Sequence, residues 1–359
     1  MAEASPTFDI LNPFETFSFP IEDWADGVKR WSFENRELFR PMREPLDYLI
    51  IHIEGALQNA PQTVVLLALG LLAWQAAGWR VGAAVVGVLA AMGVMSEAAW
   101  ALGMTTLAIV VSAVVVCVLI GFPLGVLTGK SDKCEAVLRP VLDTMQTIPA
   151  FVYLIPVVLL LGIGNVPGVV VTVVFAVPPL IRLTSLGIRQ VSPHVVEAMR
   201  AFGATPRQIL FKVEIPLAIP NIMAGLNQTI LLSLSMVVIA SMIAVKGFGN
   251  EVLRAMGRLD AGKAIVGGFG IVILAIVLDR ITQGLGRSPR QRGSRHWYQQ
   301  GPVGILLRLL RPRRRSPRGA AATESTESTE STVATKSTVA TESTESTVAT
   351  DSEKPAQLR

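Results

Sequence analysis

The polar side chains of this sequence that could do chemistry lie inside a long apolar segment. Asn221, Gln228 and Ser235 recur at intervals of seven residues, which places them on one face of a helix. Their amide and hydroxyl groups can hydrogen-bond to neighbouring helices, at about 0.6 kcal/mol each, or line a path for a polar solute. The sequence leaves both interpretations open.

The other polar residues do not indicate catalysis. The apolar segments contain no Ser-His-Asp, Cys-His or paired-carboxylate arrangement. Cys117 and Cys134 are too few for a disulfide framework, and the three histidines lack the spacing of metal ligands. We therefore expect a protein that is not an enzyme and that holds no catalytic residue, cofactor or metal of its own.

Residues 125–131 have some features of a nucleotide-binding loop. They contain a glycine, three residues and then Gly129-Lys130-Ser131, one residue shorter than the phosphate-binding pattern. The segment also ends an apolar stretch instead of joining a strand to a helix. Gly121, Gly125 and Gly129 recur every four residues, which favours close packing on another helix. We therefore expect no ATP site in this chain.

The composition is that of a polytopic all-α membrane protein. Of 359 residues, 51% are hydrophobic and 16% charged, with a mean hydropathy of +0.50. The net charge of +5 comes largely from arginines after residue 286 and in loops between apolar segments. This distribution indicates membrane topology and not binding of nucleic acid.

The apolar segments number seven, and about 20 apolar residues suffice to cross a bilayer. With seven spans, the basic residues of four regions fall on one side, which the positive-inside rule makes cytoplasmic. The N-terminus is then outside and the C-terminus inside, and only loop 246–261, with Arg254 and Arg258, dissents. The segments are 62–78, 81–95, 100–128, 149–164, 166–186, 217–245 and 262–282; the basic regions are 79–80, 130–139, 182–212 and 287 onward.

Five regions follow from this pattern. The net-acidic tail has an amphipathic stretch, 21–57, which forms interfacial helices or packs on its own protein. The basic segment touches anionic lipid or simply anchors the last span, and the final repeats are expected to be disordered. The regions are the acidic external tail 1–60, accessory transmembrane helices 61–99, a helical core 100–284 with a polar loop at 190–216, a basic cytoplasmic segment 285–319, and a low-complexity tail 320–359.

The polar loop 190–216 predicts two short helices. Ser192-Pro193 begins the first, and Gly203 can adopt the left-handed turn that closes it. Thr205 and Gln208 form a capping box for the second helix, and Pro216 is expected to end it. A DNA-binding helix-turn-helix has the same outline, but flanking spans would hold this loop against a membrane. The first helix has an apolar face that needs a partner, formed by Val195, Met199 and Phe202.

These residues resemble the EAA loop of ABC importer permeases, which reads Glu-Ala-Ala, three residues, Gly, nine residues and Ile-x-Leu-Pro. Met199 replaces the second alanine, and Val213 and Ile215 stand at the aliphatic positions. A wider resemblance, over roughly residues 10–305, is to the permeases of glycine betaine/proline betaine importers. The matching positions in the loop are Glu197, Ala198, Gly203 and Pro216; beyond it they are 142–153, 162–168 and 279–280.

The resemblance implies a type I ABC importer permease core in the plasma membrane, working as two copies. A cytoplasmic ATPase dimer would bind ATP and Mg²⁺ and receive the loop, while an external binding protein would deliver the substrate. Glu197 would meet polar or basic groups of the ATPase, Ala198 and Met199 would enter its groove, and Gly203 would hold the turn. The expected cargo is glycine betaine, proline betaine or a related quaternary ammonium osmoprotectant.

Two alternatives remain open. The chain could be an ATPase-independent secondary transporter or osmotic channel, which has no need of a docking loop. It could also be an ABC permease for another small solute, such as an amino acid or an oxyanion.

Overall fold

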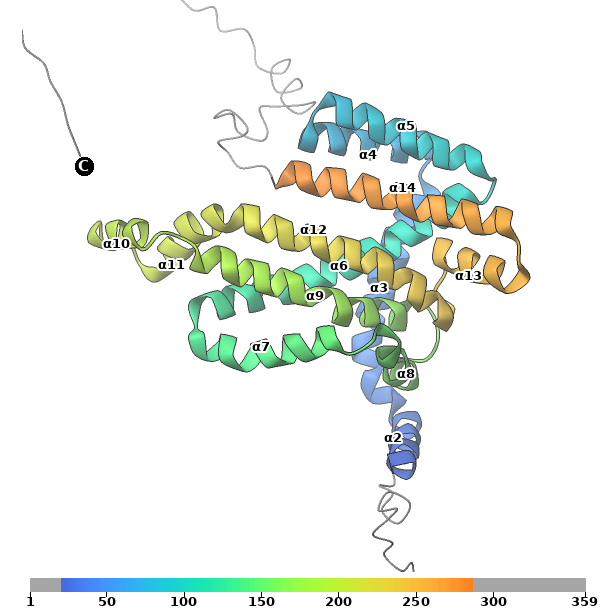
Figure 1. The fold of residues 1–359 in the computed structure, drawn as a ribbon, viewed down its shortest axis with the longest axis horizontal. Helices are drawn as coiled ribbons and strands as arrows, with labels where there is room; N and C mark the ends of the chain where they lie inside the picture. The colour runs from blue at the N-terminus through green and yellow to red at the C-terminus, as the bar shows by residue number, and fades with distance from the viewer. Residues whose placement is uncertain (1–20, 287–359) are drawn as a thin grey trace, which may run out of the picture. The chain divides into compact units, whose positions relative to one another are not determined.

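The computed structural model of the chain describes residues 21–286, which form helices and no strand (Figure 1). The predictions for residues 1–20, for nearly all of segment 285–319 and for tail 320–359 lie outside the described residues. The elements are α2 (Ile21–Glu34), η1 (Arg36–Phe39), α3 (Arg40–Asn59), α4 (Gln62–Ala77), α5 (Trp79–Met95), α6 (Ala99–Lys130), α7 (Asp132–Thr147), α8 (Ala150–Leu161), α9 (Asn165–Arg189), α10 (Pro193–Ala201), α11 (Pro206–Ile209), η2 (Leu210–Glu214), α12 (Ile215–Ala240), η3 (Ser241–Ile243), α13 (Phe248–Arg258) and α14 (Ala261–Leu285).

Helices α6, α9 and α12 pack along one another and form the core (Figure 1). The contact of α6 with α9 is close because glycines of α6 face α9. A methyl group on Gly125 would lie 2.5 Å from Cβ of Thr184, and one on Gly129 would lie 3.0 Å from Cβ of Ile188. Gly121 packs on α9 in the same way. The prediction that these glycines serve helix packing is therefore confirmed.

Helices α4, α5 and α14 form a second group beside the core. The helices α4 and α5 pair as a hairpin, and α14 packs against both of them and against α12. A methyl group on Gly284, near the end of α14, would lie 2.7 Å from the carbonyl carbon of Ala76, near the end of α4. The end of α14 and the turn between α4 and α5 therefore lie at the same end of the helices.

The apolar segments are all helical, but their lengths differ. Four helices are long and apolar enough to cross a membrane, namely α6, α9, Pro206–Ile243 and α14, and the number rises to six if each of two bent pairs is one span. The bends are 109° between α3 and α4 and 101° between α7 and α8. With 12 residues, α8 is about 18 Å long, against about 30 Å of hydrocarbon. Seven full-length spans are not found among the described residues, and the number of crossings stays a prediction.

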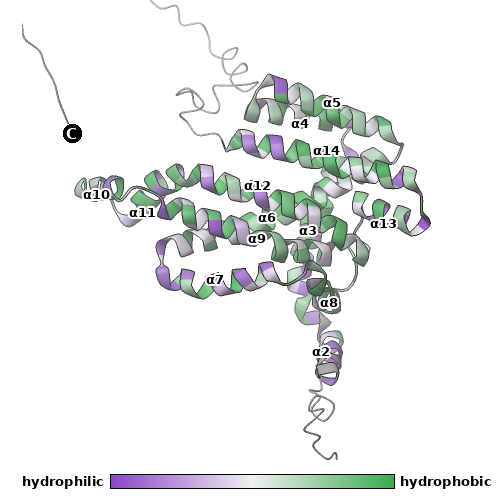
Figure 2. Ribbon diagram, viewed as in Figure 1, coloured by the Kyte–Doolittle hydropathy of each residue, from purple (hydrophilic) through white to green (hydrophobic). Residues whose placement is uncertain are grey.

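The turns of three basic regions lie at one end of the helices. There Arg189 donates to the carbonyl of Thr128 at 2.8 Å, and the amide of Asn221 donates to that of Gln190 at 2.9 Å. At the opposite end the backbone N–H of Phe248, the first residue of α13, donates to the hydroxyl of Thr106 near the start of α6. Arg254 and Arg258 of α13 therefore lie at the end away from the other basic regions. Figure 2 shows hydrophobic residues along α4, α5, α6, α9, α12 and α14, with hydrophilic residues along α7 and α2. The cellular side of each end stays a prediction.

Helix α3 packs on the core. Ile50 is 2% exposed, and the hydroxyl of Thr105 in α6 donates to Glu54 at 2.9 Å and accepts from Gln58 at 2.7 Å. On α2, by contrast, Trp31 is about half exposed. Packing on its own protein, one of the two interpretations of stretch 21–57, therefore describes α3. An interfacial position for α2 stays a prediction.

Cysteine accessibility tests the orientation. In a chain carrying Cys117→Ala and Cys134→Ser, we expect Ser192→Cys to react with a membrane-impermeant maleimide only after the cells are permeabilised, because loops rich in basic residues stay in the cytoplasm. The matched control is Met256→Cys in α13, which is 64% exposed at the opposite end and should react in intact cells. Reaction of Ser192→Cys in intact cells would establish the reverse orientation.

Candidate functional site

The loop 190–216 folds as a helical hairpin with well-formed turns. Gly203 has φ of +77°, and its N–H donates to the carbonyl of Arg200 at 2.9 Å, so the predicted left-handed turn is confirmed. The capping box is also confirmed: Thr205 N–H donates to Gln208 Oε1 at 2.9 Å, and Gln208 N–H donates to Thr205 Oγ at 3.4 Å. Ser192 occupies the N-cap position of α10, but its hydroxyl makes no cap hydrogen bond.

The prediction that Pro216 ends the second helix is wrong. The helix runs without a break from Pro206 to Ile243. Just before the proline it widens into a π-turn, Leu210–Glu214, in which the N–H of Ile215 donates to the carbonyl of Leu210. A π-turn shifts the register of carbonyls ahead of the proline, which has no N–H to donate. The chain therefore enters α12 directly from the hairpin.

The two helices of the hairpin differ in burial: Ile209 of α11 is buried, whereas α10 is not covered by the described chain. None of the residues of α10 is buried. Val195 is 41% exposed and Phe202 is 88% exposed, while Met199 is half-buried. Of the other predicted site residues, Glu197, Ala198, Gly203 and Pro216 are exposed and Ile215 is half-buried. An apolar side chain as exposed as Phe202, on a helix that buries nothing, indicates a surface for a binding partner.

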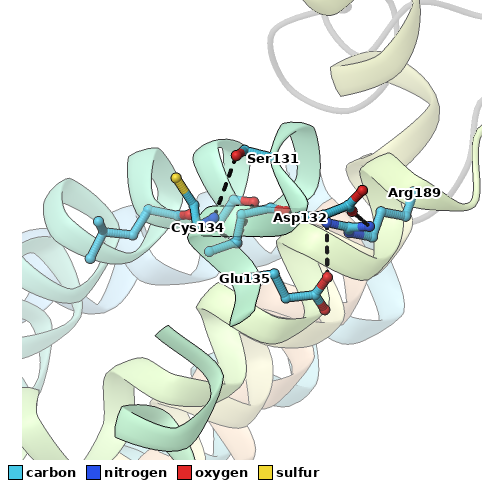
Figure 3. Close-up of polar contacts among 8 residues, drawn as sticks. Ser131, Asp132, Cys134, Glu135 and Arg189 are labelled. Atoms are coloured by element: carbon cyan, nitrogen blue, oxygen red, sulfur yellow. Dashed lines mark hydrogen bonds and ion pairs between the residues drawn. The ribbon is translucent and has the colours of Figure 1, made fainter. Parts of the chain in front are cut away.

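Polar contacts that the sequence did not reveal hold the two ends of this loop. At its start, Arg189 forms ion pairs with Asp132 at 2.6 Å and Glu135 at 2.8 Å (Figure 3). At its end, Lys130 Nζ lies 2.8 and 2.9 Å from the two carboxylate oxygens of Glu214. These partners are far apart along the chain, and no pattern in a single sequence pairs them.

The turn between α6 and α7 supports this arrangement. Ser131 is the N-cap of α7, and its hydroxyl accepts from the N–H of Cys134 at 3.4 Å (Figure 3). The cap starts α7 directly after Lys130 and presents Asp132 and Glu135, in its first turn, to α9. The short segment 130–135 therefore supplies partners for both ends of the loop. Lys130 bonds Glu214 at the end of the loop, and Asp132 and Glu135 bond Arg189 at its start.

The predicted polar face of α12 is divided. Asn221 bonds to Gln190, as the helix-packing interpretation expects. Gln228 and Ser235 are exposed, and the hydroxyl of Ser235 donates to the carbonyl of Leu231 in its own helix at 3.1 Å. Whether Gln228 and Ser235 line a solute path stays a prediction.

The buried polar contacts of α12 lie beside that face. The hydroxyl of Thr229 donates to the carbonyl of Ala176 in α9 at 2.9 Å. The amide of Asn227 donates to Asp279 at 3.0 Å and accepts from the hydroxyl of Thr282 at 2.6 Å. Interhelical hydrogen bonding by residues next to the predicted face therefore joins α12 to α9 and to α14.

Cation-binding and phosphate-binding features are weak in the described part of the chain. Among residues 21–286 no three His, Cys, Asp or Glu side chains are grouped to hold a metal ion. In segment 125–131, Gly125 and Gly129 lie against α9 and Lys130 is paired with Glu214. The residues that resembled a nucleotide-binding loop therefore have structural contacts of their own.

The match to a protein family defines the class of the protein, the membrane component of a binding-protein-dependent transport system. Residues 121–291, which include the loop and the helices on both sides of it, match the family described as "Binding-protein-dependent transport system inner membrane component". A solved structure described as inward facing conformations of the MetNI methionine ABC transporter is 22% identical, with a TM-score of 0.45 over 51% of this chain and 93% of that chain.

More similar relatives narrow the class. The chain is 53% identical over 302 residues, 84% of this chain and 85% of that protein, to the glycine betaine/proline betaine transport system permease protein ProW of Escherichia coli (strain K12). It is 54% identical over 185 residues, 52% of this chain and 66% of that protein, to the glycine betaine/carnitine transport permease protein GbuB of Listeria monocytogenes serotype 1/2a (strain 10403S). The chain belongs to the family of glycine betaine/proline betaine transport system permeases.

The caps of the hairpin give a matched pair of variants. Thr205→Ala removes a cap bond and should destabilise the start of α11 by about 1 kcal/mol. Ser192→Ala removes a hydroxyl that caps nothing and should leave α10 unchanged. Hydrogen–deuterium exchange is the measurement, and amides 207–212 should exchange several-fold faster in the first variant only. Equal exchange in both variants would contradict the role of the capping box.

Proposed function

We propose that this permease imports glycine betaine, proline betaine or a related quaternary ammonium osmoprotectant, driven by ATP that a separate subunit hydrolyses. The observation that carries the proposal is the similarity to ProW over most of both chains, which includes the hairpin with its exposed first helix. Such cargo keeps a permanent positive charge and needs a hydrated or hydrogen-bonding path through hydrocarbon. ATP and Mg²⁺ belong to the partner ATPase in this proposal.

The loop 190–216 docks on the ATPase dimer. An exposed apolar face with a carboxylate at its edge suits a groove lined by apolar and basic groups. Ala198 and Met199 enter the groove, Glu197 meets polar or basic groups, and Gly203 sets the angle of the hairpin. Met199 is half-buried, so part of its side chain remains available for contact with the groove. The segment Ile215-Pro216, which carries the loop into α12, completes this site.

The remaining partners are a second copy of the chain, an external binding protein and membrane lipid. Gln228 and Ser235 lie exposed on α12, and a polar face exposed to hydrocarbon would be costly. A second copy placed over this face would enclose the two side chains between protomers and give the solute path polar walls. In this arrangement the loop end is cytoplasmic and the N-terminus is external.

Selectivity resides mainly in the external binding protein. Quaternary ammonium groups are usually held by cages of aromatic rings. Among the aromatic residues of α8 and α9, Tyr153 and Phe175 pack on the same small apolar cluster, and the Tyr153 hydroxyl donates to the carbonyl of Met145 at 2.7 Å. Phe151 is 53% exposed and is not part of that cluster. The three aromatic residues of α8 and α9 therefore do not all belong to one cluster.

The competing functions differ in what they require of the hairpin. A secondary transporter or osmotic channel works without a subunit bound to the loop, so the exposure of Phe202 favours the ATP-driven importer. A permease for an amino acid or an oxyanion would use the same loop, and only transport assays distinguish it.

Two single variants, Gly203→Val and Glu197→Ala, test the role of the loop. Valine at φ of +77° is strained by about 1 to 2 kcal/mol and should misdirect the hairpin, and loss of the carboxylate should weaken the docking contact. We expect both variants to reach the membrane at parental levels but to lose at least about tenfold in uptake. Gly257→Val, at a helical glycine with open space, is the control for valine. Parental uptake in both variants would contradict the docking role.

Substrate uptake tests the cargo. Cells without other betaine carriers, supplied with this permease, its ATPase and its binding protein, should accumulate labelled glycine betaine and grow at high osmolarity. Deletion of the binding protein should abolish both, because selectivity resides there in this proposal. Uptake of an amino acid or an oxyanion in place of betaine would overturn the proposed cargo, and uptake that survives the deletion would overturn the division of roles.

A further inference from the structure

An ion pair between a buried carboxylate and a partly exposed lysine stands where the loop 190–216 enters α12. Glu214 is the last residue of the π-turn, and its side chain is 6% exposed. Lys130 is the last residue of α6, and its ammonium group lies 2.8 and 2.9 Å from the two carboxylate oxygens. The pair joins the exit of the loop to the end of a core helix 84 residues away in the sequence.

The hairpin is held at Ile209 of α11, which is buried, but its first helix has no comparable attachment. No residue of α10 is buried, and the helix contacts little except α11. The start of the loop is held by Arg189, through Asp132, Glu135 and the carbonyl of Thr128. The end of the loop is held by Glu214. A displacement of the hairpin therefore reaches α12 along the continuous helix, and it reaches α6 and α7 through these polar attachments.

Stability alone is a poor explanation for the pair at the end of the loop. Taking the Glu214 carboxylate out of water costs free energy that attraction to the 40% exposed Lys130 need not exceed, so an uncharged residue of similar volume at position 214 would stabilise the fold as well. An ion pair, unlike an apolar contact, holds its two groups together in one orientation. It also sits on a π-turn followed by proline, where the helix has fewer regular hydrogen bonds to resist bending.

We propose that the ion pair Lys130–Glu214 transmits movement of the loop to α6, so that both are positioning residues for energy coupling. The proposal rests on the docking of the loop to an ATPase. Movement of α10 and α11 displaces the π-turn, and Glu214 carries the end of α6 with it through Lys130. Without the pair, the hairpin moves while α6 stays behind, and ATP is hydrolysed without transport.

The test is the amount of solute transported per ATP hydrolysed, in proteoliposomes holding the permease, the ATPase and the loaded binding protein. Lys130→Glu and Glu214→Lys each place like charges together and should lower this ratio by about tenfold or more. The double variant restores opposite charges and should recover the ratio to within about threefold of the parental value. A purely structural role would lower the amount of assembled complex and leave the ratio of the remainder unchanged.

Lys133→Glu is the matched control, since it makes the same charge change on an exposed residue three positions further along. It should keep the parental ratio. If the single charge reversals do not assemble, the milder Glu214→Gln is measured by the same criterion. A parental ratio in Lys130→Glu, Glu214→Lys or Glu214→Gln, or a double variant as defective as the single ones, would overturn the proposal.

Failure of the proposed cargo would look different. Every variant is compared with the parental complex carrying the same solute. A wrong cargo leaves the parental complex without betaine uptake, whereas a wrong role for the ion pair leaves the ratio unchanged in the variants.

Discussion

Helices in hydrocarbon have no hydrophobic driving force toward one another, so small residues that let their backbones approach decide which of them pack. In this chain that contact is made by α6 on α9, where Gly125 and Gly129 leave room for Thr184 and Ile188. The contact brings the ends of the two helices together, and so sets the Thr128 carbonyl within 2.8 Å of the Arg189 guanidinium. The place where the polar loop starts is therefore fixed by van der Waals contact further along the helices.

The two ends of the loop are fixed by different means. Its start follows from the packing of α9, whereas its end depends on a helix that changes register before Pro216. The π-turn lets one continuous helix leave the hairpin and become α12, and it points Glu214 toward the end of α6. Water is scarce around a side chain that is 6% exposed, so the carboxylate needs the lysine, and the lysine then fixes the position of the turn.

Local features of the loop could be predicted from the sequence because they depend on neighbouring residues. The left-handed Gly203 and the capping box of Thr205 and Gln208 are of this kind, and both are confirmed. The end of a helix at Pro216 could not be predicted from propensity, because a proline within the first turn of a helix and one that follows a helix have the same local sequence. The pairing of Lys130 with Glu214 depends on tertiary packing, and periodicity in one sequence carries no such information.

The same limit applies to the prediction of a polar face on α12. A spacing of seven residues assigned Asn221, Gln228 and Ser235 to one face of the predicted helix, but it could not say which neighbours each of them would meet. The helix instead uses the adjacent Asn227 to reach Asp279 in α14, at 3.0 Å. This contact joins α12, in the core, to α14, in the second group of helices. Lys130 joins α6, also in the core, to the end of the loop. In the proposed coupling, movement of the loop would reach the second group of helices through α12, because directional hydrogen bonds keep their alignment while apolar surfaces can slide.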